Sequence, residues 1–486
     1  MWLILVFLPI AAFLYWQYWK LTHKRLLELA AKIPGPPALP ILGNALLFSG
    51  DPEEMLHNMA VKPYGEYARF WLGPDLNIAV KNPADIRDLL TSNKLSKKGP
   101  TYEFLKPLLG YGLIVGGPNW RQHRKIAITS YNKKCVSQFS PVFNKEAEQM
   151  ARVISNRDPN VAFDVYKDVV KCTTQCVNQT LMGLTKEESL NISRLDELVE
   201  QTRNLYEFGF ERMRKWWLQI PFIYWLLGYP IRLKYFTKLV DDFAKDVVEK
   251  RRKALAESTP NEETMCIVDR FILSGELSEE EIKLETFTAF TSSQEPTANV
   301  ASGILMILAH LPDWQDKVYN EMLEVLGPSG PVDAEQLKQL HYLDMVLLET
   351  VRYFPAAVLI QRTVLEDVSI DNGRITLPAG ISVVFPIHEL NNDPQYWEHP
   401  KKMMPDRFLP ENVKQRDPNV FVPFSLGPMN CLGRIYSPAL VKTLVVWVLR
   451  YAYLEPAGSL DNIKLHISVS ATSADGCHIR ARPRHS

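Results

Sequence analysis

The residue best suited to redox or metal chemistry is a cysteine in a loop that contains glycine and proline. Cys431 ends the stretch FVPFSLGPMNC and precedes an apolar run over residues 435–449 that is typical of a helix. A thiolate held there gains from the partial positive charge of a helix N-terminus. Phe424 can shield the sulfur, while Gly427 and Gly433 let the backbone pass close to a flat ligand. The alternative is a buried structural cysteine, the commoner fate of an isolated one.

Charged residues elsewhere have spacings that could support such a site. Glu349 and Arg352 stand three residues apart, which places them on one helix face, although such a pair is more often a solvated surface bridge. Trp120 and Arg124 share a face of a second helix, which Pro118 suits as its first turn. An arginine there can bind a carboxylate, and the simpler interpretation is a surface cation packed on an aromatic ring.

The spacing F-x-x-G-x-x-x-C-x-G resembles the haem-binding loop of the cytochrome P450 family, and the other motifs follow in the family's order. The resemblance extends from the proline-rich stretch near residue 33 to the C-terminus. It is strongest to clan four, the fatty-acid hydroxylase-like branch, and to its insect members. It implies a mainly α-helical fold with small β-sheets and haem b as cofactor, with Cys431 as the axial ligand of the haem iron.

The resemblance also assigns roles to individual side chains. The residues implied to contact haem or its propionates are Trp120, Arg124, Arg362, Phe424, Gly427 and Gly433. A buried network implied to brace the haem loop consists of Glu349, Arg352 and Arg407. One departure is Met429, which stands where the family has a third basic residue for the propionates. We expect loss of one member of the buried network to be severe, because its partners would keep uncompensated charges.

A long central helix is predicted over residues 278–310, with a capping box from Ser278 to Glu281 and a stop at Pro312. In the family this helix crosses the haem and carries the motif A-G-x-D/E-T-T. Here the corresponding residues are SSQEPT, from Ser292 to Thr297. The helix should therefore contribute the residues that take part in oxygen activation.

Within that motif the acid is kept as Glu295, while Pro296 replaces the first threonine. Proline supplies no hydroxyl, removes an N–H and crowds the carbonyl of Ser292, so we expect a kink. Glu295 and Thr297 are the predicted catalytic residues, and with Ser293 they could hold a water that replaces the threonine. Many clan-four members have a haem-esterifying glutamate at the position of Ser292, so no covalent haem link is expected.

The N-terminus predicts attachment to a membrane. Residues 1–19 have no charged side chain and are followed by a basic cluster, which favours a transmembrane signal anchor over a cleaved signal peptide. Residues 20–43 form a basic linker and proline-rich hinge, and residues 44–486 form the haem-thiolate catalytic domain. We expect a single-pass protein of the endoplasmic reticulum with its catalytic domain in the cytosol. The aromatic-rich segment 206–236 either dips into the membrane interface or forms a core helix pair.

The 55 basic and 55 acidic residues balance, so no nucleic-acid partner is expected. The leading hypothesis is a monooxygenase for a lipophilic substrate such as a fatty acid, terpenoid, pheromone or xenobiotic. The resemblance implies electrons from NADPH through NADPH-cytochrome P450 reductase, with cytochrome b5 as a second donor. Because of Pro296, two alternatives stay open: a haem-thiolate isomerase or dehydratase, and a haem-binding protein without turnover. The substrate walls implied by resemblance are residues 102–113, Phe290, Thr291 and residues 356–359.

Overall fold

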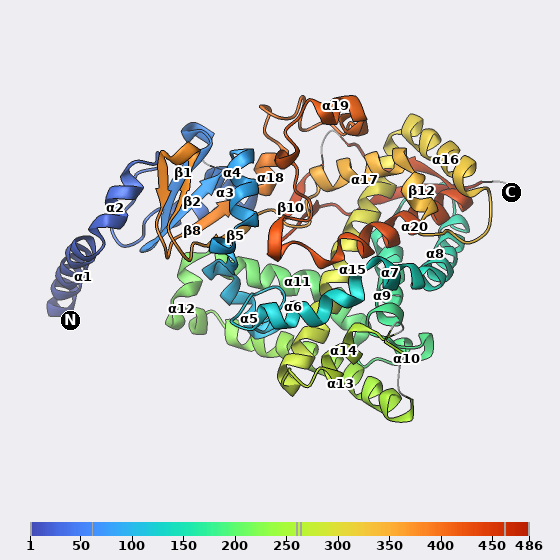
Figure 1. Cartoon of the computed structure of the whole chain (residues 1–486), viewed down its shortest axis with the longest axis horizontal. Helices are drawn as coiled ribbons and strands as arrows, with labels where there is room; N and C mark the ends of the chain where they lie inside the picture. Colours follow the sequence, from blue (N-terminus) through green and yellow to red (C-terminus); the bar gives the residue numbers. More distant parts are fainter. Residues whose placement is uncertain (1, 61, 259–260, 263–264, 461–462, 485–486) are drawn as a thin grey trace.

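Helices make up most of the chain, with small β-sheets beside them (Figure 1). The computed structural model describes residues 2–60, 62–258, 261–262, 265–460 and 463–484. The helices are α1 (Trp2–Thr22), α2 (Lys24–Ala31), α3 (Pro52–Ala60), α4 (Pro83–Thr91), α5 (Lys106–Leu109), α6 (Trp120–Ile128), α7 (Lys133–Gln138), α8 (Ser140–Ser155), α9 (Tyr166–Thr180), α10 (Lys186–Leu190), α11 (Leu195–Arg214), α12 (Pro221–Leu226), α13 (Tyr229–Glu257), α14 (Ile267–Leu273), α15 (Glu279–His310), α16 (Pro312–Leu326), α17 (His341–Tyr353), α18 (Ile387–Asn391), α19 (Pro410–Lys414) and α20 (Tyr436–Tyr451).

The largest sheet is mixed and has the strand order β1-β2-β8-β5-β3. Strand β2 pairs parallel to β8, and the other neighbours in this sheet are antiparallel. The strands are β1 (Tyr67–Leu72), β2 (Asp75–Val80), β3 (Lys97–Lys98), β4 (Phe163–Asp164), β5 (Ile360–Thr363), β6 (Val368–Ile370), β7 (Ile375–Leu377), β8 (Ser382–Phe385), β9 (Ala452–Pro456), β10 (Leu465–Ile467), β11 (Ala471–Ser473) and β12 (His478–Pro483). This sheet joins segments that are more than 260 residues apart, such as β3 and β5, which both border the site.

The N-terminal helix α1 lies at one end of the molecule, and α2 lies between it and the large sheet (Figure 1). Trp19 is buried and packs edge-on against Trp71 of β1, with ring centroids 5.6 Å apart. Within the described part of the chain, no helix combines the length and hydropathy needed to cross a bilayer. Residue 1 of the expected anchor over residues 1–19 lies outside the described residues.

The proline-rich hinge is fastened to strand β1. Arg69 donates from its backbone N–H to Pro34 O (2.8 Å) and from Nε to Ile33 O (2.8 Å). A Cβ on Gly35 would lie 2.1 Å from Arg69 O, so only glycine allows this approach. The hinge therefore holds the N-terminal helices in a defined position relative to the sheet.

Helix α15 crosses the middle of the helical body (Figure 1). It begins with the predicted capping box, in which Ser278 and Glu281 hydrogen-bond reciprocally. Side chains on all of its faces are buried, which is typical of a helix enclosed by other helices. The helix continues through Pro296 without a break, and the proline leaves Ser292 O without its helical N–H donor. The kink expected at Pro296 stays a prediction.

Candidate active site

The loop before α20 turns sharply to present Cys431. The backbone N–H of Cys431 donates to Phe424 O (2.8 Å) and closes the loop. Gly427 has φ +71°, and a Cβ there would lie 2.2 Å from Leu90 O. Both the left-handed conformation and the close approach require glycine at this position. Cys431 is the residue before the short helix Leu432–Arg434, as the sequence predicts for a thiol near a helix N-terminus.

The thiol of Cys431 faces a cavity rather than bulk water. The space at this cavity, including the part that is open to solvent, is about 1770 Å³, and Cys431, Phe424 and Gly433 are among the residues that line it. Cys431 is exposed to that space while protein surrounds the rest of the side chain. Burial raises the pKa of the thiol, against the lowering effect of the Gly433 backbone N–H and of nearby cations. A metal at the sulfur would add the positive charge that a thiolate needs in such surroundings.

Three cations line the same cavity, and no carboxylate does so among the described residues. Arg362 is 2% exposed and donates from Nη1 to the Gln361 carbonyl (3.1 Å). Arg124 donates to Asn430 O (2.8 Å), and Trp120 lies beside it in the wall. In the described structure none of these cations forms an ion pair with a carboxylate. Arg362 is buried and Lys98 and Arg124 are half-buried, and cations in such surroundings are costly without an anion, so this donor set fits the two carboxylates of a haem group.

The third cation, Lys98, was not found by sequence reasoning. Strand pairing places Lys98 directly opposite Arg362, and like charges in that position destabilise a sheet unless an anion lies between them. Burial lowers the pKa of Lys98, and the neighbouring guanidinium groups lower it further. A Cβ built on Gly116 lies close to Lys98 Cγ (2.6 Å) and to Met429 Cε (3.4 Å), so these two side chains are neighbours. Lys98 thus brings a basic group to the place where Met429 lacks one.

The structure brings Glu349, Arg352 and Arg407 together as a buried cluster. Both oxygens of Glu349 accept from Arg352, at 2.7 and 2.8 Å, and neither side chain is exposed. Arg407 Nε lies 3.4 Å from Glu349 Oε1, which also accepts from the Met404 N–H (2.9 Å). Remaining guanidinium donors reach backbone carbonyls of the segment before the haem loop, including Asn391 O and Pro400 O. Because Glu349 and Arg352 are both buried, the alternative interpretation of a solvated surface ion pair is excluded.

Helix α15 forms another part of the cavity wall. Its residues that line the cavity are Ser292, Ser293, Pro296, Thr297 and Val300. The Ser292 hydroxyl donates to Thr288 O (2.6 Å), whereas the Ser292 carbonyl has lost its helical donor to proline. Ser293 Oγ hydrogen-bonds to Tyr131 OH (2.9 Å), and Tyr131 also lines the cavity. Thr297 Oγ1 donates to Ser437 Oγ (3.1 Å).

Glu295 is not among the described residues that line this cavity. Its carboxylate is 6% exposed and accepts from Asn299 Nδ2 (2.5 Å). Burial raises the pKa of Glu295, although Asn299 and Arg203 lower it. The catalytic roles of Glu295 and Thr297 therefore stay predictions, and a direct contact of Glu295 with substrate does not follow from its position.

The loop, the cation-lined cavity and the helix above it together define a haem-thiolate site. A family profile described as Cytochrome P450 matches residues 33–469. Cytochrome P450 4c3 of Drosophila melanogaster is 28% identical and aligns over 95% of this chain and 91% of its own. Cytochrome P450 4V2 of Homo sapiens is 28% identical over 92% and 89%, and Cytochrome P450 4d2 of Drosophila melanogaster is 28% identical over 99% of both. The chain belongs to the cytochrome P450 family.

Family membership fixes the general activity and the cofactor. The protein is a haem-thiolate monooxygenase that binds iron protoporphyrin IX without a covalent link. It requires a redox partner and a small-molecule substrate. The mainly helical fold with small sheets agrees with the sequence prediction.

Proposed function

We propose that this protein is a membrane-anchored monooxygenase that oxidises a lipophilic substrate with electrons from NADPH-cytochrome P450 reductase. Cytochrome b5 is proposed as a second electron donor. The observation that carries the substrate class is the largely apolar lining of the cavity that Cys431 faces and of a second cavity that shares Tyr102 with it. The bound haem supplies the chemistry of oxygen activation, with the cysteine ligand favouring O–O cleavage. The residues of this chain bind, orient and shield the reactants.

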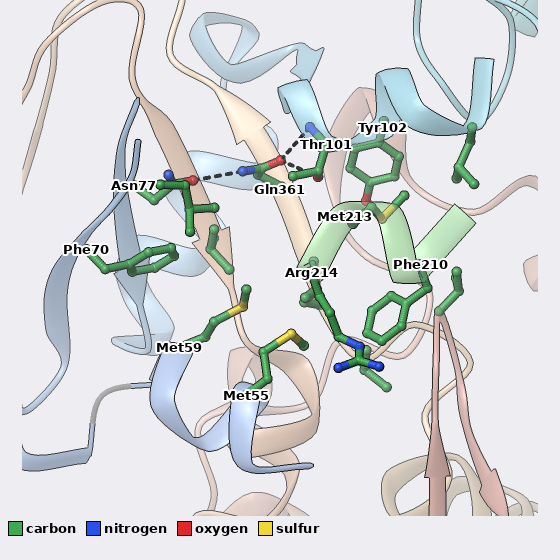
Figure 2. Close-up of a pocket in the computed structure, with 16 residues that line it drawn as sticks. Met55, Met59, Phe70, Asn77, Thr101, Tyr102, Phe210, Met213, Arg214 and Gln361 are labelled. Atoms are coloured by element: carbon green, nitrogen blue, oxygen red, sulfur yellow. Dashed lines mark hydrogen bonds between the residues drawn. The ribbon is translucent and has the colours of Figure 1, made fainter. Parts of the chain in front are cut away.

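A second cavity, called the outer cavity below, has about 690 Å³ of space including the part that is open to solvent (Figure 2). Tyr102 lines both cavities. Strand β5 lies between the two cavities, because successive side chains of a strand point to opposite faces. Ile360 and Arg362 line the haem cavity, and Gln361 lines the outer one. The apolar residues of the outer wall are Met55, Met59, Phe70, Leu72, Leu105, Phe210, Met213, Val358, Leu359, Val384 and Val469. A flexible apolar molecule is the ligand that such a wall suits.

The polar groups of the outer cavity are few and mostly satisfied. Gln361 bridges Asn77 Oδ1 (2.8 Å) and the Thr101 hydroxyl (2.6 Å), as the dashed lines in Figure 2 mark. Arg214 brings one guanidinium to the wall, where it donates to Gly50 O (2.5 Å). Sequence reasoning found no such charge, because Arg214 reaches this wall only through the packing of α11. The Arg214 guanidinium could therefore pair with a carboxylate at one end of an otherwise apolar substrate.

The substrate walls expected from the sequence divide into three groups. Tyr102, Leu113, Ala356 and Ala357 line the haem cavity, and Val358 and Leu359 line the outer one. Phe290 and Thr291 lie on a different face of α15. Phe290 packs on Phe243 with centroids 4.4 Å apart, and Thr291 Oγ1 hydrogen-bonds to Tyr206 OH (3.0 Å). These two residues support the wall from behind rather than form it.

Exposed apolar side chains support the proposed attachment to a membrane of the endoplasmic reticulum. They occur on α1, on residues 39–47, and on α12 with the residues after it, and α1 and α12 lie toward the same side of the view in Figure 1. The exposed residues are Ile10, Phe13, Leu14, Tyr15, Leu21, Leu39, Ile41, Leu46, Leu47, Phe222, Trp225, Leu226, Leu227 and Ile231. Apolar groups of this number on one end are expected to enter the lipid interface. Segment 206–236 therefore combines the two expected features, because its first residues pack in the core and its apolar side chains near residues 222–227 are exposed.

Pro296 motivates the second candidate, a haem-thiolate isomerase or dehydratase acting on a peroxide. The two candidates differ in their need for NADPH and O₂. Purified protein in lipid, with its reductase and ¹⁸O-labelled O₂, is given a panel of fatty acids, terpenoids and their hydroperoxides. Label in a product only with NADPH supports the monooxygenase reaction. Rearranged hydroperoxide that forms without NADPH and without label refutes it and favours the isomerase or dehydratase.

A further inference from the structure

The loop over residues 110–117 forms part of the haem cavity's wall. It follows α5 through Gly110, whose φ of +66° requires a residue that tolerates the left-handed region. Leu113 and Ile114 in this loop line the cavity, as do Trp120 and Arg124 of the helix that follows. A loop without regular secondary structure needs other contacts to hold such a wall in one position.

Helix α15 supplies those contacts through a buried carboxylate. Glu285 is 2% exposed, and its Oε1 accepts from the Leu113 backbone N–H (3.0 Å). A Cβ on Gly112 would lie 1.2 Å from the same oxygen, so the loop backbone passes directly against the carboxylate. One turn further along the helix, Thr288 Oγ1 donates to Leu109 O (3.3 Å). The loop is thus attached to the helix at both sides of Gly110.

The same carboxylate oxygen lies 2.8 Å from His123 Nδ1. His123 is 1% exposed and belongs to α6, the helix of Trp120 and Arg124. Burial lowers the pKa of His123, but the hydrogen bond and charge of Glu285 raise it overall. Burial in turn raises the pKa of Glu285. Glu285 therefore links three parts of the site, namely α15, the loop and α6.

Two atoms of this cluster have no hydrogen-bond partner in the described structure. They are Glu285 Oε2 and His123 Nε2, the latter 3.6 Å from Glu281 Oε1. A buried carboxylate that is only half satisfied is costly for stability alone. An apolar residue would pack two helices together without that cost, but it could not accept the Leu113 N–H. The hydrogen bond to the Leu113 N–H in the cavity wall is thus the contact that requires a hydrogen-bond acceptor at position 285.

We propose that Glu285 is a positioning residue that fixes Leu113 and Ile114 in the cavity wall, through the Leu113 N–H, and so determines which ligands fit above the haem. The proposal rests on the proposed function in one respect, because it requires that haem binds in this cavity. It concerns ligand fit and does not depend on which substrate is oxidised.

The test compares a small and a larger ligand of ferric haem, imidazole and 4-phenylimidazole, by their Soret shifts in full-length protein. The variants are Glu285→Ala, which removes the acceptor, and Glu285→Gln, which keeps a carbonyl oxygen for the Leu113 N–H. The control is Glu281→Gln, since Glu281 also faces His123 but does not touch the loop. Amide exchange of the peptide over residues 109–117 is measured in parallel.

We expect Glu285→Ala to change the Kd of 4-phenylimidazole at least tenfold, to change that of imidazole less than threefold, and to raise exchange in residues 109–117. Glu285→Gln and the control should keep both Kd values within threefold of wild type. Unchanged Kd values in Glu285→Ala, equal changes for both ligands, or a Glu285→Gln variant that behaves like Glu285→Ala would each overturn the proposal.

If Glu285→Ala does not bind haem, Glu285→Asp replaces it, because its carboxylate is one methylene further from the loop. The expected result for that variant is at least a threefold change for 4-phenylimidazole alone, and no change overturns the proposal. A wild-type protein without a thiolate-type reduced carbon monoxide spectrum would instead refute the haem site of the proposed function. The two failures are therefore distinguishable.

Discussion

Replacing Arg352 with methionine tests whether the buried charge cluster holds the site together. Methionine is apolar, unbranched and shorter than arginine by the end of the guanidinium group, so the change removes the charge and the hydrogen bonds while it keeps the apolar stem. Glu349 would stay fully buried and keep only the Met404 N–H at 2.9 Å and the distant Arg407 Nε at 3.4 Å. Removing one partner of a buried ion pair costs about 3–5 kcal/mol, because the other charge is left uncompensated.

The structure supports the upper part of that range. Besides its two bonds to Glu349, Arg352 donates to Asn391 O (2.9 Å), Pro400 O (2.8 Å) and Lys402 O (3.3 Å). These carbonyls would lose a donor as well, at about 1–3 kcal/mol for each one left unsatisfied and not additively. A protein domain is stable by only about 5–15 kcal/mol, so most of the margin would be lost.

A matched control exists at the surface. Arg374 and Asp371 form the same i, i+3 pair with an N–O distance of 2.8 Å, but the Arg374 side chain is 73% exposed. Exposed pairs contribute about 0–1 kcal/mol, so Arg374→Met should be nearly silent. The two pairs share the i, i+3 spacing and a close N–O contact, but the Arg352 pair is buried and bidentate whereas the Arg374 side chain is exposed and makes a single bond to the Asp371 carboxylate.

The assay is the urea midpoint of unfolding together with the haem content per polypeptide, read from the reduced carbon monoxide spectrum. We expect Arg352→Met to yield little haem-loaded protein and a strongly lowered midpoint, while Arg374→Met matches wild type. Arg352→Lys should be intermediate, because an ammonium cannot form the two parallel bonds of a guanidinium. Equal midpoints and haem contents for Arg352→Met and Arg374→Met would refute the reasoning.

Three further predictions concern the cavity and the central helix. Cys431→Ala should abolish the thiolate-type reduced carbon monoxide spectrum, and a normal spectrum from that variant would exclude Cys431 as the ligand. Lys98→Met should speed haem transfer to apomyoglobin about tenfold, as expected for loss of about 1.4 kcal/mol of binding. The control Lys97→Met changes the exposed neighbour and should leave the transfer rate unchanged. Equal transfer rates for the two variants would show that Lys98 does not bind a propionate. Because burial raises the pKa of Glu295 above its ordinary 4.5, the folded state holds this proton to higher pH than the unfolded state. The free energy of unfolding should therefore fall as pH rises from about 4.5 through the raised pKa. Glu295→Gln should weaken this pH dependence of the urea midpoint. A variant whose urea midpoint changes with pH as steeply as that of the wild type would contradict the prediction.

Local spacing in the sequence predicted the parts of the site that lie on one element. Cys431 with its glycines, the pair Glu349 and Arg352, and the capping box at Ser278 are contacts within a few residues, which helix periodicity and turn chemistry decide. The resemblance added Arg362 and Arg407, whose positions the structure then placed beside the cavity and the buried cluster.

The tertiary structure alone decided which distant residues meet. Lys98 faces Arg362 only because β3 pairs with β5, across more than 260 residues of sequence. Glu285 reaches Leu113 across 172 residues, and Tyr131 reaches Ser293 across 162. The rotation of α15 likewise decided that Thr297 faces the cavity and Glu295 does not. Such contacts depend on strand register and on how a helix packs against its neighbours, and neither leaves a pattern in the residues of one segment.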